Sequence, residues 1–185
     1  MHDSISAAHV LSGIDELHDS AVHVAESEGP RDVTEVVLAW TADGAAIDLD
    51  GMARGTRVTG YRVEERLHWD LGPPPATVSR FSFVRRRPDL TRAQFADHWS
   101  TVHAPLARRH HPALWRYVQN VVIEPMTPGA PEVDGIADLG FRSLEDLSTR
   151  MYDSPEGMAT IRADVRRFID LDAGWRVVTR SSASP

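Results

Sequence analysis

The order of apolar and polar positions from residue 78 onward predicts strands and helices in alternation. Val78 to Arg85 is rich in Phe, Val and Ser, and Arg86-Arg87-Pro88-Asp89 then interrupts it, which predicts a strand that ends in a turn. Further strands are expected at 114–124, 135–141 and 175–179, with helical spacing of apolar residues at 91–106, at 144–151 and, after Ser154-Pro155, at 158–169. The resulting order of strand, helix, strand, strand, helix, strand predicts an α+β fold with a ferredoxin-like split βαβ unit.

The first predicted helix carries two histidines beside its apolar stripe. Thr91 and Gln94 fit a capping box, so Thr91 is the expected N-cap. The stripe consists of Phe95, Trp99, Val102 and Leu106. On a regular helix His98 and His103 point about 140° apart, on opposite shoulders of this stripe. Pro105 removes a backbone donor and clashes with the preceding turn, which predicts a kink or break near residues 101–104.

The first 75 residues are expected to form an N-terminal extension, or a degenerate second ferredoxin-like half, beside a domain at 76–185. The pattern predicts a weak helix at 8–25 and strands at 33–40 and 56–69, and Gly72-Pro73-Pro74-Pro75 marks the joint. A four-stranded sheet with helices on one face needs a cover for its other face. Either this extension closes the barrel within one chain, or two chains pair; a homodimer is the expected arrangement.

Composition excludes several classes of function. The chain has 185 residues and no cysteine, so neither disulfides nor a thiol nucleophile are available. All twenty cationic residues are arginine, and without lysine no Schiff base can form. A net charge of −7 disfavours a nucleic-acid partner. No apolar run approaches the ~20 residues that span a bilayer, and no signal sequence is recognised, so we expect a soluble cytoplasmic protein without a membrane partner.

Several spaced motifs resemble those of the EthD-like proteins, a family named for ethyl tert-butyl ether degradation. The matching segments are Arg-Arg-Pro-Asp-Leu-Thr at 86–91, the helix through His98-Trp99, His103-Ala104-Pro105-Leu106, Arg-Tyr-Val-Gln-Asn at 116–120, Asp-Gly-Ile-Ala at 134–137 followed by Phe141, and Ser-Pro-Glu-Gly at 154–157. The resemblance covers about residues 78–181 and implies a dimeric α/β barrel. Family members often carry a histidine directly after the Tyr-Val-Gln-Asn run, where this chain has Val121.

His103 is the leading candidate for a general acid or base, because an imidazole titrates near neutral pH. The alternative is a core histidine whose ring is satisfied by a backbone carbonyl. His98 is a second candidate, and Tyr117 could polarise a carbonyl or stabilise an enolate. Asp138 is a possible orienting carboxylate for a histidine. The spacing of His98 and His103 differs from the i, i+4 pair of zinc helices, so no metal site is expected.

These residues suggest an apolar cavity between helix and sheet. Its expected lining is Trp99, Phe81 or Phe83, Tyr117 and Phe141, with Asn120 and Arg85 as further substrate contacts. Such a cavity suits a flat hydrophobic or aromatic molecule. Nucleotide-binding fingerprints are not recognised, and no cofactor is expected.

The resulting hypothesis is an enzyme that uses histidine to move protons on a polyketide-like or aromatic substrate, in cyclisation, dehydration or decarboxylation. Two alternatives stay open. One is a cofactor-free monooxygenase of anthrone-like substrates, and the other is a non-catalytic protein that binds a hydrophobic ligand or haem.

Overall fold

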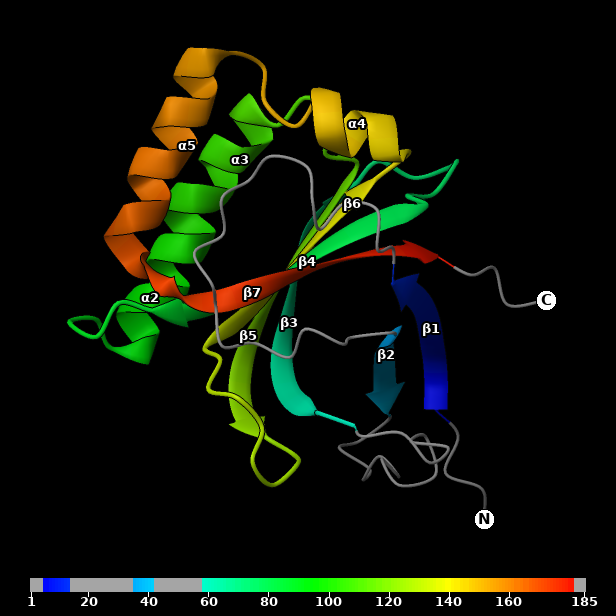
Figure 1. Ribbon diagram of the computed structural model, residues 1–185, viewed down its shortest axis with the longest axis vertical. Helices are drawn as coiled ribbons and strands as arrows, with labels where there is room; N and C mark the ends of the chain where they lie inside the picture. Colours follow the sequence, from blue (N-terminus) through cyan, green and yellow to red (C-terminus); the bar gives the residue numbers. More distant parts are fainter. Residues whose placement is uncertain (1–4, 14–34, 42–57, 182–185) are drawn as a thin grey trace.

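The computed structural model describes residues 5–13, 35–41 and 58–181, which form one antiparallel sheet and a group of helices (Figure 1). The strands are β1 (Ile5–Gly13), β2 (Glu35–Thr41), β3 (Tyr61–Asp70), β4 (Val78–Arg86), β5 (Arg116–Pro125), β6 (Gly135–Phe141) and β7 (Ile169–Ser181). The helices are α2 (Arg92–His98), the π-helix η3 (Trp99–His103), α3 (Ala104–His110), α4 (Leu144–Thr149) and α5 (Pro155–Phe168). None of the described helices is long and apolar enough to cross a membrane.

The sheet has the order β2-β1-β7-β4-β6-β5-β3. Its central strands β7-β4-β6-β5, with helices after β4 and after β6, are the ferredoxin-like unit that the pattern predicts, so the α+β fold class is confirmed. Strand β3 from the N-terminal part pairs with β5 along residues 61–70, and β1 with β2 extends the sheet beyond β7. Dimerisation stays a prediction.

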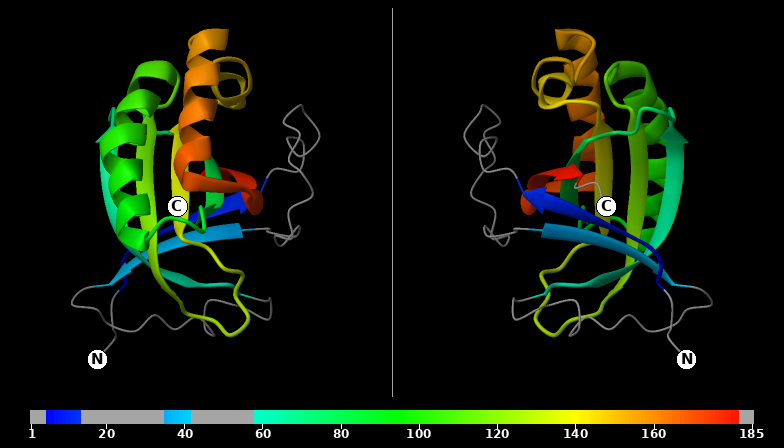
Figure 2. Two further views of the ribbon diagram at one scale, coloured as in Figure 1. Left: turned by 90° about the vertical axis from the view of Figure 1, so that its left-hand side faces the viewer. Right: turned by 90° about the vertical axis from the view of Figure 1, so that its right-hand side faces the viewer.

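The helices lie together on one side of the sheet, and the hydrophobic core lies between the two layers (Figures 1 and 2). Phe95 and Trp99 from the first helix meet Phe168 from α5 over Tyr117 and Phe141 of the sheet. Gly135 on β6 lets this packing close, because a Cβ there would lie 2.8 Å from Cη2 of Trp99. The apolar stripe of the first helix therefore faces the sheet, as its spacing indicates.

Two sequence-based assignments are wrong. Residues 8–13 belong to strand β1, paired with β2, whereas helical spacing was expected there; residues 14–25 lie outside the described part. Strand β7 begins at Ile169, directly after α5, and not at Trp175. Residues 169–174 include Asp170, Asp172 and Gly174, residue types that are uncommon in strands, so the pattern did not predict a strand there. The strand pairs with β4 in an irregular register. Pairing with the neighbouring strand overrides local propensity in both places.

Candidate active site

The helix that carries the histidines begins where the sequence predicts. The Thr91 hydroxyl accepts from the backbone N–H of Gln94, and the Gln94 side chain accepts from the N–H of Thr91, which completes the capping box. Phe95 and Ala96 then bury the first turn against the core. This fixed start sets the rotation of the helix and hence the direction of His98.

The expected break before Pro105 takes the form of the π-helix Trp99–His103. The N–H of Ala104 donates to the carbonyl of Trp99, five residues earlier, and Pro105 itself has no N–H to continue a regular ladder. In a π turn, side chains five apart lie over one another, as those four apart do in an α-helix. The regular-helix separation of His98 and His103 is therefore wrong: the wider turn brings both rings to the same face.

Both rings meet Asp164 on α5. His98 Nε2 lies 2.9 Å from Oδ1 of Asp164, and His103 Nδ1 lies 2.9 Å from Oδ2. The Asp164 side chain is 4% exposed, against 23% for His98 and 10% for His103. One buried carboxylate thus holds two imidazoles, and we call these three residues the Asp164 cluster.

Electrostatics assigns the protons in this cluster. Burial alone would raise the pKa of Asp164, but the hydrogen bonds from His103 and His98 and their charges outweigh it and lower this pKa below its ordinary value. An ionised carboxylate can only accept, so Nδ1 of His103 and Nε2 of His98 both carry hydrogen. Nε2 of His103 makes no hydrogen bond to the described residues. It is also not among the buried polar atoms that lack a hydrogen-bond partner, so this nitrogen lies at the solvent-accessible edge of the ring.

The Phe168 ring packs against both histidine rings. Its ring centroid lies 4.9 Å from that of His98 and 5.2 Å from that of His103, and Phe168 is fully buried. An apolar floor removes competing water from the hydrogen bonds to Asp164, which strengthens them.

Tyr117 lies on β5, 2% exposed, on the helix side of the sheet. Its phenol oxygen accepts hydrogen bonds from Nε1 of Trp99 and Nε2 of Gln119, each at 3.0 Å. Burial raises the pKa of Tyr117 to about 12, although both hydrogen bonds oppose the shift. The phenol is neutral at pH 7 and keeps a proton to donate.

The other candidate contacts divide between the two faces of the sheet. Phe141 joins Trp99 and Tyr117 in the core on the helix side. Phe83 stacks on Trp175 at 4.7 Å, and its alternate position on β4, shared by Phe81, places both on the face away from the helices. The expectation of one cavity lined by all these aromatic residues is therefore wrong, since strand alternation separates them.

The two polar candidates are already engaged. Asn120 is 5% exposed, and its side-chain amide donates to the carbonyl of Ile136. Arg85 forms an ion pair with Glu132 at 2.6 Å. Neither shares a contact with the Asp164 cluster.

Asp164 is the residue that sequence reasoning missed. The suggested carboxylate, Asp138, instead binds Arg116. A signal for Asp164 existed: it lies three residues after Ile161 and four before Phe168, both buried, so a carboxylate occupies an apolar position of the α5 stripe. A buried carboxylate demands a partner, and two histidines on the facing helix are the available ones.

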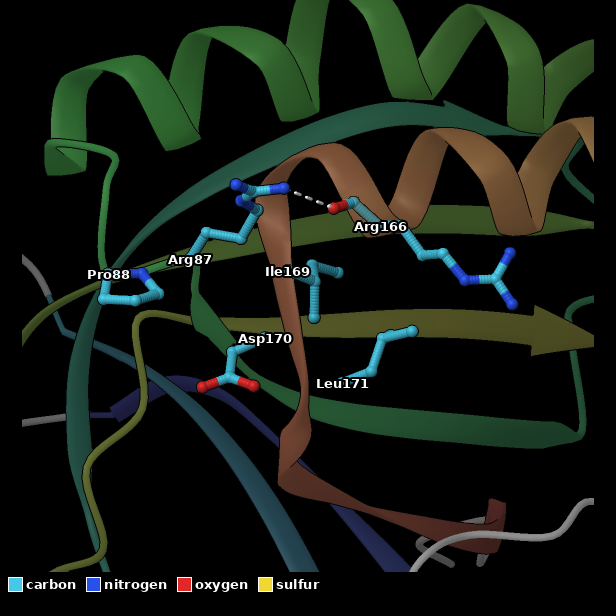
Figure 3. A pocket seen from close by; sticks show the side chains of 6 residues that line it. All are labelled: Arg87, Pro88, Arg166, Ile169, Asp170 and Leu171. Atoms are coloured by element: carbon cyan, nitrogen blue, oxygen red, sulfur yellow. Dashed lines mark hydrogen bonds between the residues drawn. The ribbon is translucent and has the colours of Figure 1, made fainter.

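A shallow pocket of about 320 Å³ lies elsewhere, between the turn after β4 and the start of β7 (Figure 3). Its lining is Arg87, Pro88, Arg166, Ile169, Asp170 and Leu171. None of the catalytic or substrate-contact residues predicted from the sequence lines this pocket. Within 5–13, 35–41 and 58–181, no group of three or more acidic or histidine side chains is arranged to hold a metal ion.

Comparison with known proteins gives a family match over part of the chain. Residues 87–172 match the family model described as the EthD domain, a span that contains the whole Asp164 cluster. Searches of curated proteins and of solved structures returned no significant match.

Proposed function

Because the chain carries an EthD domain at residues 87–172, we propose that it is a cofactor-independent enzyme whose Asp164 cluster transfers protons on a hydrophobic substrate. The observation that carries the proposal is the hydrogen bond between Nδ1 of His103 and the buried carboxylate of Asp164. A carboxylate in this position holds the imidazole in one tautomer and stabilises the imidazolium that forms when the ring takes a proton.

His103 is the proposed general acid and base. Its Nε2 is the nitrogen free to meet a substrate, because Nδ1 is committed to Asp164. His98 shares the same carboxylate and acts as a positioning residue. Its Nε2–H donates a hydrogen bond to the other oxygen of Asp164, which favours the ionised carboxylate. Tyr117 is the proposed donor to an oxyanion, since its phenol is neutral and held by two fixed N–H groups.

The reaction class follows from what one imidazole and one phenol supply. A base that removes a proton from carbon beside a carbonyl, together with a donor that stabilises the enolate, supports cyclisation or dehydration. The reverse transfer, from imidazolium to an enolate left by loss of carbon dioxide, supports decarboxylation. A polyketide-like or aromatic substrate fits these steps because its carbonyls acidify neighbouring C–H groups.

We also expect the enzyme to act as a homodimer, which sedimentation velocity would test.

A chromogenic carbon acid tests the base directly. 5-Nitrobenzisoxazole opens to a coloured phenolate when a base removes its ring C–H proton, and this reaction requires no other group. We expect His103→Gln to lower the enzymatic rate ~10²-fold or more. The control is His110→Gln, which removes a histidine bound to Asp153 outside the cluster. Equal rates for wild type and His103→Gln would exclude His103 as the base.

Two parallel measurements distinguish the alternatives. Turnover of an anthrone substrate that consumes oxygen under air and stops under nitrogen would indicate a monooxygenase that uses the same proton abstraction to form a substrate carbanion. Binding of haem or of a hydrophobic ligand without turnover of any carbon acid would indicate a binding protein and would overturn the catalytic proposal.

A further inference from the structure

Arg80 on β4 is a partly buried cation that meets no carboxylate within the described part of the chain. Its Nε atom is buried and has no hydrogen-bond partner among the described residues, and its Nη1 group donates to Sδ of Met151 at 3.2 Å, a weak acceptor. Burial, with the charge of Arg176 adding to it, lowers the pKa of Arg80 to about 10, so the guanidinium is still charged at pH 7. Elsewhere in the described residues, partly buried arginines meet carboxylates, as Arg116 meets Asp138 and Arg86 meets Asp134.

Two further groups beside Arg80 also lack partners. Ser82 is 7% exposed, and its buried hydroxyl oxygen has no hydrogen-bond partner among residues 5–13, 35–41 and 58–181. Arg176 on β7 lies directly opposite Ser82 in the strand register and forms none of the ion pairs found in the described part of the chain. Arg176 is exposed, so this group of residues opens to solvent. The charge of Arg162 on α5 also acts on Arg176.

The energetics of this arrangement call for an anion. A buried charge that lacks a partner is strongly destabilising, whereas a bound oxyanion would restore the missing hydrogen bonds and the missing charge. Arginine presents a planar fork that matches a carboxylate in two parallel hydrogen bonds, and the Ser82 hydroxyl supplies a further donor. A singly charged carboxylate suits a partly buried site better than a doubly charged phosphate, because desolvation costs rise steeply with charge.

We infer that Arg80, Arg176 and Ser82 bind the carboxylate of an organic acid. This inference rests on the proposed function and specifies its substrate as an aromatic or polyketide-like acid. The charges of Arg80 and of Asp164 both act on the Tyr117 phenol, which places Tyr117 near both groups.

Calorimetric titration with benzoate tests the site. Benzoate should bind the wild-type protein, while neutral benzamide should bind at least ~10-fold more weakly, since a hydrogen bond to a charged group contributes about that factor. Arg80→Met and Arg176→Met should each weaken benzoate binding ~10-fold or more. The matched control is Arg167→Met, an exposed arginine of α5, which should leave it unchanged. Equal binding by wild type and Arg80→Met, or no benzoate binding, would overturn the inference. Inorganic phosphate that binds as tightly as benzoate would overturn the assignment to a carboxylate.

A ligand-free measurement gives a second test. Arg80→Met replaces a partly buried charge, which meets no carboxylate among the described residues, by an apolar chain of similar length, so the melting temperature without ligand should rise. A clear fall would mean that Arg80 is already compensated and would contradict the inference.

The two proposals fail separately. His103→Gln should lower turnover ~10²-fold or more while benzoate still binds. Turnover that survives His103→Gln, with benzoate binding that still depends on Arg80, would refute the proposed function alone. Turnover that depends on His103, with benzoate binding indifferent to Arg80, would refute the carboxylate site alone.

Discussion

Acidification should weaken the fold through His111, a buried histidine that stays neutral when folded. Its Nδ1–H donates to the carbonyl of Met151 at 2.6 Å, and its ring packs on Tyr152, so it ties the end of α3 to the segment before α5. Burial lowers the pKa of His111 to about 4 from 6.5, aided by the charges of Arg80, His103 and His110 and opposed by the bond to Met151.

The direction and size of the effect follow from linkage. The folded pKa lies below the unfolded pKa, so between pH 6.5 and about 4 the unfolded chain binds a proton that the folded chain refuses. The contribution of His111 is therefore fully present above pH 6.5 and is lost as pH falls toward 4. The loss amounts to about 2 kcal/mol at pH 5 and about 3 kcal/mol at pH 4. His111 is 5% exposed, so solvent screening does not reduce this figure much.

Urea unfolding at about pH 7.5 and pH 5 measures how much of the pH dependence of the unfolding free energy comes from His111. The difference in unfolding free energy between the two pH values should shrink by about 2 kcal/mol in His111→Gln, whatever that variant does to stability at a single pH. His110→Gln is the matched control, because the charge of His110 is the smallest of the contributions to the lowered pKa of His111, so the difference should change far less than in His111→Gln. The same pH dependence in wild type and His111→Gln would refute the account of a neutral buried ring.

Four further changes test the fold and the cluster. Thr91→Ala removes the capping box and should cost ~1 kcal/mol in urea unfolding. Gly135→Ala places a methyl group against the Trp99 ring and should cost ~1–3 kcal/mol in the same assay; unchanged stability would mean that the ring moves freely. Pro105→Ala restores an N–H and should convert the π turn to a regular one, which changes the ring-nitrogen shifts of both cluster histidines while helical circular dichroism is kept. Asp164→Asn should destabilise the fold at pH 7 and lose less stability than wild type below about pH 4, because the lowered pKa of Asp164 stabilises only above that range.

Much of the fold was predictable because its signals are local. The Thr91 cap, the stripe through Phe95 and Trp99, and strand β6 at 135–141 each depend on residues close in sequence, and the structure confirms them. The family resemblance is confirmed over residues 87–172. Strand β1 was missed because its extended state depends on pairing with β2 and β7, which lie far away along the chain.

The site was only partly predictable. His98 and His103 stood out on their helix, and Pro105 indicated a break, but the sequence could not show that the break is a π turn that aligns the rings. Asp164 lies about sixty residues from His103, and its role depends on how α5 packs against the first helix. Which carboxylate meets the histidines depends on tertiary packing, which is why the sequence pointed to Asp138 and missed Asp164.

Ring-nitrogen NMR on the wild-type protein and Asp164→Asn tests the central claim most directly. The account predicts that at neutral pH His103 carries its hydrogen on Nδ1 and His98 carries its hydrogen on Nε2, both facing Asp164, and that the substitution changes both sets of shifts. A His103 ring with its hydrogen on Nε2, and with shifts indifferent to residue 164, would contradict the claim.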